Sequence, residues 1–238
     1  MEHLQVALAT IATATETVLP VIAEDVHRAR PDMGPGYIRS LDLVSANARR
    51  IRVLPQGAYA GIEVSGRAAT FVRPGNDQRI PELLLPPNGP YTVYGLQDAV
   101  GNQAVYGLLR LRYGQQNAPS PGDGQVIGRR GAGDRNSVAD TWTRTHDSFW
   151  TAAGYELTEG KRYQIRGMRA FGTGLIAARL TCPEWNGMKP GVAGYATDQC
   201  YMYQFSDCPE FTHPSVVSVE ALDSGAAAIT VELHIVAL

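Results

Sequence analysis

The segment Ile229-Thr230-Val231-Glu232-Leu233-His234-Ile235 alternates apolar and polar side chains with a strict period of two. Only an extended strand turns that period into one apolar and one polar face. A β-branched run, Val216 to Val219, comes before it, and Asp223-Ser224-Gly225 lies between the two. These three residue types tolerate the backbone angles of a tight connection. The sequence therefore predicts a C-terminal hairpin whose second strand runs to the last residue and belongs to a core sheet.

The composition indicates a folded protein made of many short elements. The chain has 238 residues, of which 44% are hydrophobic and 18% charged, with 25 glycines and 15 prolines. That balance is ordinary for a chain that buries a core, and the glycines and prolines favour turns over long helices. The formal charge of -2 gives no reason to expect binding to nucleic acid or to an anionic membrane through bulk electrostatics.

The cysteine count and the first residues indicate where the chain is made. Three cysteines, an odd number, do not suggest a secreted disulfide framework. Met1-Glu2-His3 lacks the basic and apolar regions of a signal peptide. No window reaches the roughly 18 uninterrupted apolar residues that span a bilayer. We therefore expect synthesis and folding in a cytoplasm.

The first 36 residues predict a partly helical arm. Apolar side chains follow a helical spacing between residues 4 and 30, at Leu4, Leu8, Ile11, Val18 and Ile22. Several threonines weaken a helix there, and Pro20 should end or kink it. Prolines and glycines then cluster from Pro31 to Gly36. We place the boundary there, between an N-terminal arm (1–36) and a main domain (37–238).

The main domain predicts an antiparallel jelly-roll-like sandwich. Short β-rich segments separated by glycine and proline turns recur along it, and the segment from Trp142 to Trp150 also alternates like a strand. We expect about nine to eleven strands with no recurrent helix between them, which favours an all-β sandwich over a parallel sheet. The register of apolar residues changes at Gly167, which indicates a bulge or bend. The same four-residue sequence occurs at Val93 to Leu96 and at Val105 to Leu108, and this single repeat is consistent with a paired hairpin at most.

Residues 114–137 are rich in glycine and proline and predict a long surface loop. Such a loop is either functional or simply solvated. Arg129, Arg130 and Arg135 could contact a partner, but a solvated loop tip is the preferred interpretation. Gly122-Asp123-Gly124 lacks the ligand series of a calcium loop.

The strongest metal candidate in the sequence is the set Cys182, Cys200, Cys208 and His213. These residue types can hold zinc, but zinc ligands usually come in close pairs such as C-x-x-C, which the set lacks. A Cys200–Cys208 disulfide would need oxidising conditions after assembly. We therefore predict buried free thiols that act as small apolar side chains, and no metal ligands or cofactor-binding residues.

No catalytic residues are predicted. His146 and Asp147 are adjacent, so a strand would point them to opposite faces. The sequence contains none of the nucleophile-elbow, metalloprotease or phosphate-loop motifs. A metal-binding cupin needs clustered histidines, whereas the five histidines here are scattered. His234, on the polar face of the last strand, is most simply a surface or subunit-contact residue, and we expect the protein not to be an enzyme.

A resemblance to a known family rests on the segments from Gly160 to Met168, Ala178 to Leu180, Met188 to Gly191, and the closing strands. With these, Tyr155 to Leu238 resembles the second half of the single-jelly-roll capsid proteins of icosahedral viruses with an internal membrane. The resemblance implies a capsid shell subunit located in a virion. It also implies contacts with copies of itself and other virion proteins, an arm reaching a neighbour or the membrane, and no catalytic residues.

Two other functional classes stay open. One is a different virion component, such as a decoration, spike or tail protein. The other is a carbohydrate-binding or hydrolytic β-sandwich, for which Trp142, Trp150 and Trp185 could provide aromatic platforms. Packing in the core is the preferred role for those tryptophans.

Overall fold

The computed structural model divides the chain into two compact units. The N-terminal unit is Leu4–Gly114, and the C-terminal unit consists of Met1–His3 and Gln115–Leu238. The structure describes residues 1–12, 15–20, 36–44, 48–56, 62–65, 83–85, 89–97, 102–114, 118–131, 141–146, 148–195, 198, 200–223 and 228–238. The division therefore lies at Gly114, whereas the sequence predicted an arm ending near residue 36 and one domain after it.

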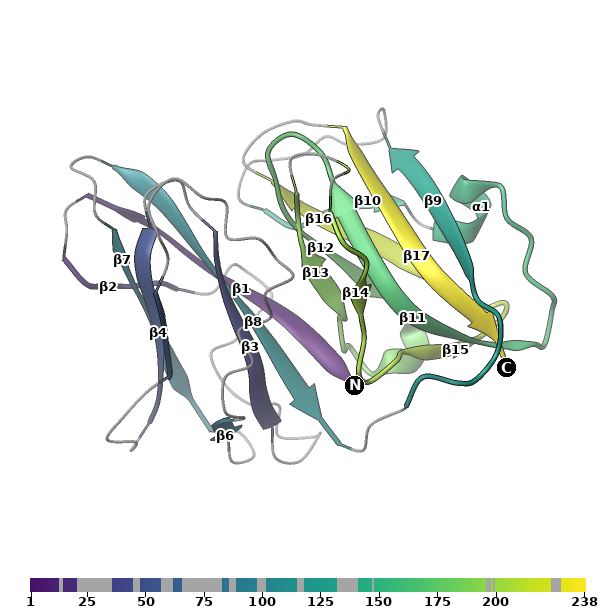
Figure 1. Ribbon diagram of the computed structural model, residues 1–238, viewed down its shortest axis with the longest axis horizontal. Helices are drawn as coiled ribbons and strands as arrows, with labels where there is room; N and C mark the ends of the chain where they lie inside the picture. Colours follow the sequence, from purple (N-terminus) through teal and green to yellow (C-terminus); the bar gives the residue numbers. More distant parts are fainter. Residues whose placement is uncertain are drawn as a thin grey trace. The chain divides into compact units, whose positions relative to one another are not determined.

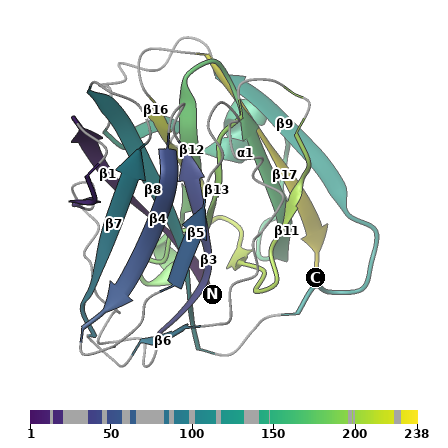
Figure 2. The ribbon, with the colours of Figure 1, turned by 60° about the vertical axis from the view of Figure 1, so that its left-hand side comes forward.

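The strands of the N-terminal unit form two four-stranded sheets (Figures 1 and 2). In chain order they are β1 (Glu2–Ile11), β2 (Thr17–Val18), β3 (Gly36–Val44), β4 (Ala48–Pro55), β5 (Ile62–Ser65), β6 (Leu83–Leu85), β7 (Tyr91–Gln97) and β8 (Gln103–Tyr113). One sheet has the order β1-β8-β3-β6 and the other has the order β2-β7-β4-β5.

The expected N-terminal helix is wrong, because the chain begins with strand β1. The adjacent residues Val6 and Ala7 are both 0% exposed, so side chains on both faces of this strand are buried. Leu4 and Ile11 are also buried. Apolar residues at three- and four-residue intervals occur by chance in a strand buried on both faces, and the threonines that weaken a helix favour a strand. Ile22 lies outside the described residues.

The two sheets of the N-terminal unit pack against each other at a glycine. A Cβ added to Gly107 of β8 would lie 2.1 Å from Cδ1 of Ile51, which belongs to β4 of the other sheet. A residue with a Cβ at position 107 would collide with the Ile51 side chain unless that side chain moved. Glycine is common where two sheets approach closely. The repeated segments Val93 to Leu96 and Val105 to Leu108 lie in β7 and β8, which belong to different sheets. They do not form the hairpin that the sequence allowed.

The C-terminal unit also contains two sheets. Its elements are β9 (Gln125–Gly131), β10 (Thr143–His146), α1 (Phe149–Ala153), β11 (Arg162–Phe171), β12 (Leu175–Thr181), η1 (Pro183–Trp185), β13 (Gly191–Ala193), β14 (Tyr203–Gln204), β15 (Glu210–Thr212), β16 (Ser218–Asp223) and β17 (Ile229–Ala237). One sheet has the order β14-β11-β17-β9, with β15 also paired to β11. The other has the order β10-β16-β12-β13.

The two C-terminal strands are confirmed, but their predicted pairing is wrong. Ile229, Val231, Leu233 and Ile235 are all buried in β17, while the alternate side chains are partly exposed. However, β16 pairs with β10 and β12, whereas β17 pairs with β11 and β9. The chain crosses from one sheet to the other between them. Two consecutive strands of a sandwich need not be hydrogen-bonded neighbours, and a sequence pattern records burial, not partners.

The predicted loop at 114–137 contains strand β9, which pairs antiparallel with β17 from Gln125 to Gly131. The glycines that suggested a loop have a packing role. A Cβ on Gly124, just before β9, would lie 1.9 Å from Nε2 of His234, so the glycine makes room for that imidazole. Residues 132–137, including Arg135, lie outside the described residues.

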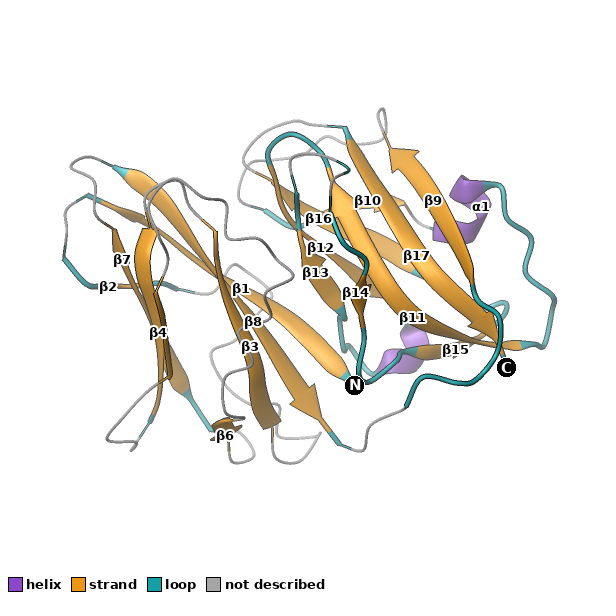
Figure 3. Cartoon of the chain, viewed as in Figure 1, coloured by secondary structure: helices purple, strands orange, loops and turns teal. Residues whose placement is uncertain are grey.

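The segment from Trp142 to Trp150 is only partly a strand. β10 ends at His146, and the short helix α1 begins at Phe149 (Figure 3). Ser148 caps that helix, because its hydroxyl oxygen accepts a hydrogen bond from the backbone N–H of Thr151. The predicted irregularity at Gly167 is confirmed, since the register of β11 on β17 shifts between Ile165 and Gly167.

The strand order is the same in the two units. The strands of each unit can be numbered 1 to 8 in chain order. In the C-terminal unit β9 is then strand 1 and β17 is strand 8, and β14 and β15 count together as strand 6 because both pair with β11. Each unit then has one sheet in the order 1-8-3-6 and one in the order 2-7-4-5.

Candidate functional site

A buried charge centre lies in the C-terminal unit. Arg179 of β12 is 0% exposed, and its Nε donates a 2.6 Å hydrogen bond to Oε2 of Glu220 on the neighbouring strand β16. Lys189 Nζ lies 3.3 Å from the same oxygen. The Arg179 guanidinium also lies 3.9 Å from the centre of the Trp142 ring. We call these four residues the charge centre.

The electrostatics of the charge centre favour an ionised carboxylate. Burial alone would raise the pKa of Glu220, but Arg179 and Lys189 outweigh burial and lower the pKa below its usual value of 4.5. The sequence analysis did not find this centre, because a single arginine within the apolar run of β12 looks like an ordinary exposed position.

The first residues of the chain are fixed within the same unit. The Glu2 carboxylate accepts hydrogen bonds from the hydroxyls of Tyr203, at 3.0 Å, and Ser206, at 2.8 Å. The Met1 ammonium pairs with the buried Asp207. Nδ1 of His3 accepts a 3.0 Å hydrogen bond from the backbone N–H of Lys189, which links the start of β1 to the segment that carries a member of the charge centre.

The partly exposed face of β17 carries a second ionic cluster. Arg169 Nε donates a 2.8 Å hydrogen bond to Oε2 of Glu232, and its Nη1 donates to the backbone oxygen of Cys200 at 3.1 Å. His234 lies on the same face of β17. Burial lowers the pKa of His234, and the nearby Arg166 lowers it further.

The three cysteines are buried free thiols, as predicted. Burial is the main cause that raises the pKa of each thiol, and it raises that of Cys208 to about 11. The Cys208 thiol donates to the backbone oxygen of Phe205 at 3.2 Å. Among the residues that the structure describes, no three His, Cys, Asp or Glu side chains are grouped closely enough to hold a metal ion.

The three tryptophans pack in the core. Trp142, Trp150 and Trp185 are 8%, 4% and 2% exposed. Trp150 stacks on Phe211 with ring centres 5.6 Å apart. Trp185 Nε1 donates a 2.7 Å hydrogen bond to the backbone oxygen of Glu210. The rings of Trp142 and Trp185 are not open platforms of the kind on which a sugar stacks, and Trp150 contributes only its small exposed part to the groove beside α1.

A shallow groove of about 420 Å³ lies beside α1. It is lined by residues of α1 and the following loop, among them Tyr155 and Glu156, and by the segment from His213 to Val216. His213 lies here, apart from the cysteines with which the sequence grouped it. The groove has one carboxylate and one imidazole, an arrangement without a recognisable catalytic pattern.

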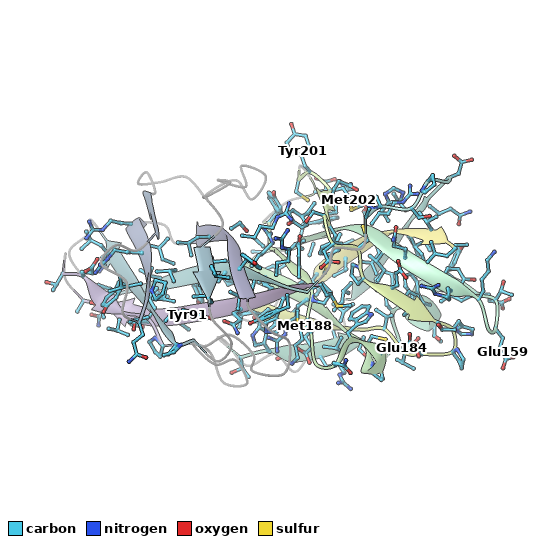
Figure 4. The ribbon with its side chains drawn as sticks, turned by 90° about the horizontal axis from the view of Figure 1, so that it is seen from below. Tyr91, Glu159, Glu184, Met188, Tyr201 and Met202 are labelled. Carbon is cyan, nitrogen blue, oxygen red and sulfur yellow. The ribbon has the colours of Figure 1, made fainter. Side chains whose placement is uncertain are left out.

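The remaining residues that the sequence analysis singled out lie outside the groups described above. His146 ends β10, but Asp147 lies outside the described residues, so the structure does not test this pair. Arg129 and Arg130 belong to β9 and oppose Val231 and Thr230 of β17. In Figure 4, Tyr201 extends away from the ribbon, in agreement with its 81% exposure. Within the described part of the chain, neither the length nor the hydropathy of any helix suits a membrane span.

Comparisons with known proteins give little further information. No family model matches the chain, and no curated protein matches it. Among solved structures, the chain is similar to the major capsid protein P2 from bacteriophage PM2, with 10% sequence identity. The match covers 100% of this chain and 98% of that one, with a TM-score of 0.25.

Proposed function

We propose that this chain is a structural virion protein, a capsid shell subunit built from two jelly rolls. It would assemble with copies of itself and with other virion proteins, and it would have no catalytic role. The proposal rests on the topology of the two units and not on the resemblance to the phage protein.

The observation that carries the proposal is the repeated strand order. Each unit has one sheet in the order 1-8-3-6 and another in the order 2-7-4-5. Eight strands that alternate between two sheets in this way make two Greek keys, which is the jelly-roll connectivity. Viral capsid domains, lectins and cupins use this architecture. The segment that resembles a single jelly roll in the sequence, Tyr155 to Leu238, falls within the C-terminal unit.

The site geometry favours the capsid class over the other two. A lectin needs accessible polar or aromatic side chains for sugar, whereas Trp142, Trp150 and Trp185 are all buried. A cupin needs histidines that converge on a metal. His3 instead accepts a hydrogen bond from Lys189, and His234 lies beside Gly124. The charge centre and the Glu2 contacts are suited to holding a fold together.

The sheet edges offer surfaces for assembly. β9 and β14 are the outer strands of one sheet of the C-terminal unit, and Val126 of β9 is 58% exposed. Unpaired edges invite aggregation, and regular contacts between subunits would cover them. Leu4 and Ile11, which the sequence placed in an arm that reaches a neighbour or the membrane, are buried within β1 and do not form a free docking surface.

The test is the mass of the purified full chain in solution, measured by light scattering over a concentration series, with negative-stain images of the same samples. Closed particles, or rings of five or six subunits, would support a shell subunit. Trimers or other low-order assemblies would favour the spike, decoration or tail alternative. A monomer at every concentration would contradict self-assembly of this chain.

A further inference from the structure

The first residues of β1 are buried in the C-terminal unit and are held there by polar side chains. Met1–His3 belong to that unit, whereas the rest of β1 belongs to the N-terminal unit. Glu2 is 1% exposed and His3 is 6% exposed. The Glu2 carboxylate accepts its hydrogen bonds from Tyr203 of β14 and from Ser206, and in Figure 1 the N-terminus lies near β14. The buried histidine at this place therefore bears on whether the start of β1 stays attached.

The hydrogen bond that His3 forms requires an imidazole without a proton on Nδ1. The backbone N–H of Lys189 donates to that nitrogen at 3.0 Å. A backbone N–H can only donate, so Nδ1 presents its lone pair, and the proton of the neutral ring is on Nε2. A protonated imidazole carries a proton on both nitrogens and has no acceptor left. Protonation of His3 would therefore replace this hydrogen bond with two N–H groups that face each other.

The charged and titratable groups that the structure describes around the start of β1 already have partners. They are the Glu2 carboxylate with the hydroxyls of Tyr203 and Ser206, the Met1 ammonium with Asp207, and Lys189 with Glu220. Burial alone would raise the pKa of Glu220, but Arg179 and Lys189 lower the pKa below 4.5. Glu220 therefore keeps its charge at the pH at which histidines ordinarily take up a proton. A cation at His3 would be a further buried charge, which is unfavourable.

We propose that His3 is an acid-sensitive anchor of β1, whose protonation breaks the hydrogen bond from Lys189 and releases the first residues of the strand from the C-terminal unit. In the open form water hydrates the imidazolium and accepts the hydrogen bond of the Lys189 N–H. The closed form binds one proton fewer than the open form, so acidification favours opening. The opening needs only one copy of the chain, so this inference does not rest on the proposed function.

The test follows hydrogen exchange of the full chain by mass spectrometry, with rates corrected for the intrinsic effect of pH. The readout is the protection of the peptides that carry residues 2–6 and Lys189. In the natural chain this protection should fall by about tenfold between neutral pH and about pH 5.5. One pH unit below the ordinary histidine value of about 6.5 contributes that factor when only the open form takes up the proton.

His3→Asn is the decisive variant. The side-chain oxygen of asparagine can accept the hydrogen bond from the Lys189 N–H in place of Nδ1, and asparagine does not titrate. The protection of both peptides should therefore change by less than about threefold over the same pH range. His3→Ala removes the acceptor and should open the start of β1 equally at every pH. In the natural chain, ¹⁵N NMR of the His3 side chain should show an unprotonated Nδ1 at neutral pH.

His213→Asn is the matched control, because it removes an imidazole elsewhere in the same unit, at the groove beside α1. This variant should keep the acid-dependent loss of protection at residues 2–6. The peptide that covers β17 reports opening of the whole unit, and its protection should be alike in the natural chain and in His3→Asn. Circular dichroism establishes that each variant is folded.

Three results would overturn the anchor. One is an equal loss of protection on acidification in the natural chain and in His3→Asn. Another is a proton on Nδ1 of His3 at neutral pH. The third is a loss of protection in β17 as large as that at residues 2–6, because the opening would then not be local. The proposed shell role is tested by self-association, so it stands or falls separately from these results.

Discussion

Among the described residues, each of the two units contains a carboxylate that is shared by two cations, but the two groups differ in burial. In the C-terminal unit, Glu220 pairs with Arg179 and Lys189, and Arg179 is 0% exposed. In the N-terminal unit, Glu16 pairs with Arg50 at 3.0 Å and with Arg52 at 2.7 Å, with all three side chains between 28% and 33% exposed. An aromatic ring adjoins each group, Trp142 for Arg179 and Tyr94 for Arg52.

The two groups contain similar charges, so the difference between them is mainly the access of water to the ion pairs. Water screens a partly exposed pair, so it contributes little to the free energy of unfolding. A buried pair gains little in net terms, but it becomes costly when one member is removed, because the other is left charged and without a partner. The charge centre should therefore be sensitive to single substitutions, and the Glu16 group tolerant of them.

The largest effect is expected for Glu220→Gln. The substitution keeps the shape of the side chain and removes the carboxylate charge that the buried Arg179 guanidinium and Lys189 share. The free energy of unfolding should fall by about 3–5 kcal/mol. Chemical denaturation, followed by circular dichroism, measures it. A loss below about 1 kcal/mol would mean that burial does not control the energy of this pair.

Acidification should remove the same stabilisation gradually. The folded-state pKa of Glu220 is lowered from 4.5. Its contribution is therefore fully present above the unfolded pKa and is lost as the pH falls through the folded pKa. The difference in unfolding free energy between the natural chain and Glu220→Gln should be constant from neutral pH down to about 4.5 and shrink below it. Denaturation curves at a series of pH values test this, and a gap that widens on acidification would contradict it.

Replacing both partners should cost far less than replacing one. In Arg179→Met/Glu220→Leu the buried charges are removed together, and Lys189, which is 21% exposed, can turn to solvent. We expect the double variant to lie within about 1 kcal/mol of the natural chain, because apolar replacements of a buried pair are often neutral. If the double variant is as unstable as Glu220→Gln, the volume and packing of these side chains outweigh their charge.

The smallest effect is expected for Glu16→Gln. Hydrogen bonding from Arg52 is the main cause that lowers the pKa of Glu16, but the group is open to solvent. The free energy of unfolding should fall by less than about 1 kcal/mol, and salt should reduce the loss further. Denaturation at low and high ionic strength checks both points. A loss comparable to that of Glu220→Gln would remove the contrast between the two groups.

The sequence predicted the strands better than their partners. The alternation in β17 was read correctly because its two faces meet different surroundings, which is what a period of two records. Pairing depends on connections between sheets, so the predicted hairpin of β16 and β17 was wrong. β9 was missed because Gly124 and its neighbours make room for side chains of β17, and glycines in a sequence usually indicate a loop.

The candidate sites were less predictable than the fold. The buried thiols followed from residue type and spacing. The charge centre did not, because β12 and β16 bring together residues that are 41 positions apart.

We propose that the repeated strand order reflects a self-assembling shell subunit. The most direct measurement is sedimentation velocity of the natural full chain across a wide range of concentrations. A shell subunit should give a species much heavier than the 25.7 kDa chain, with a population that grows with concentration. A single 25.7 kDa species throughout would contradict it.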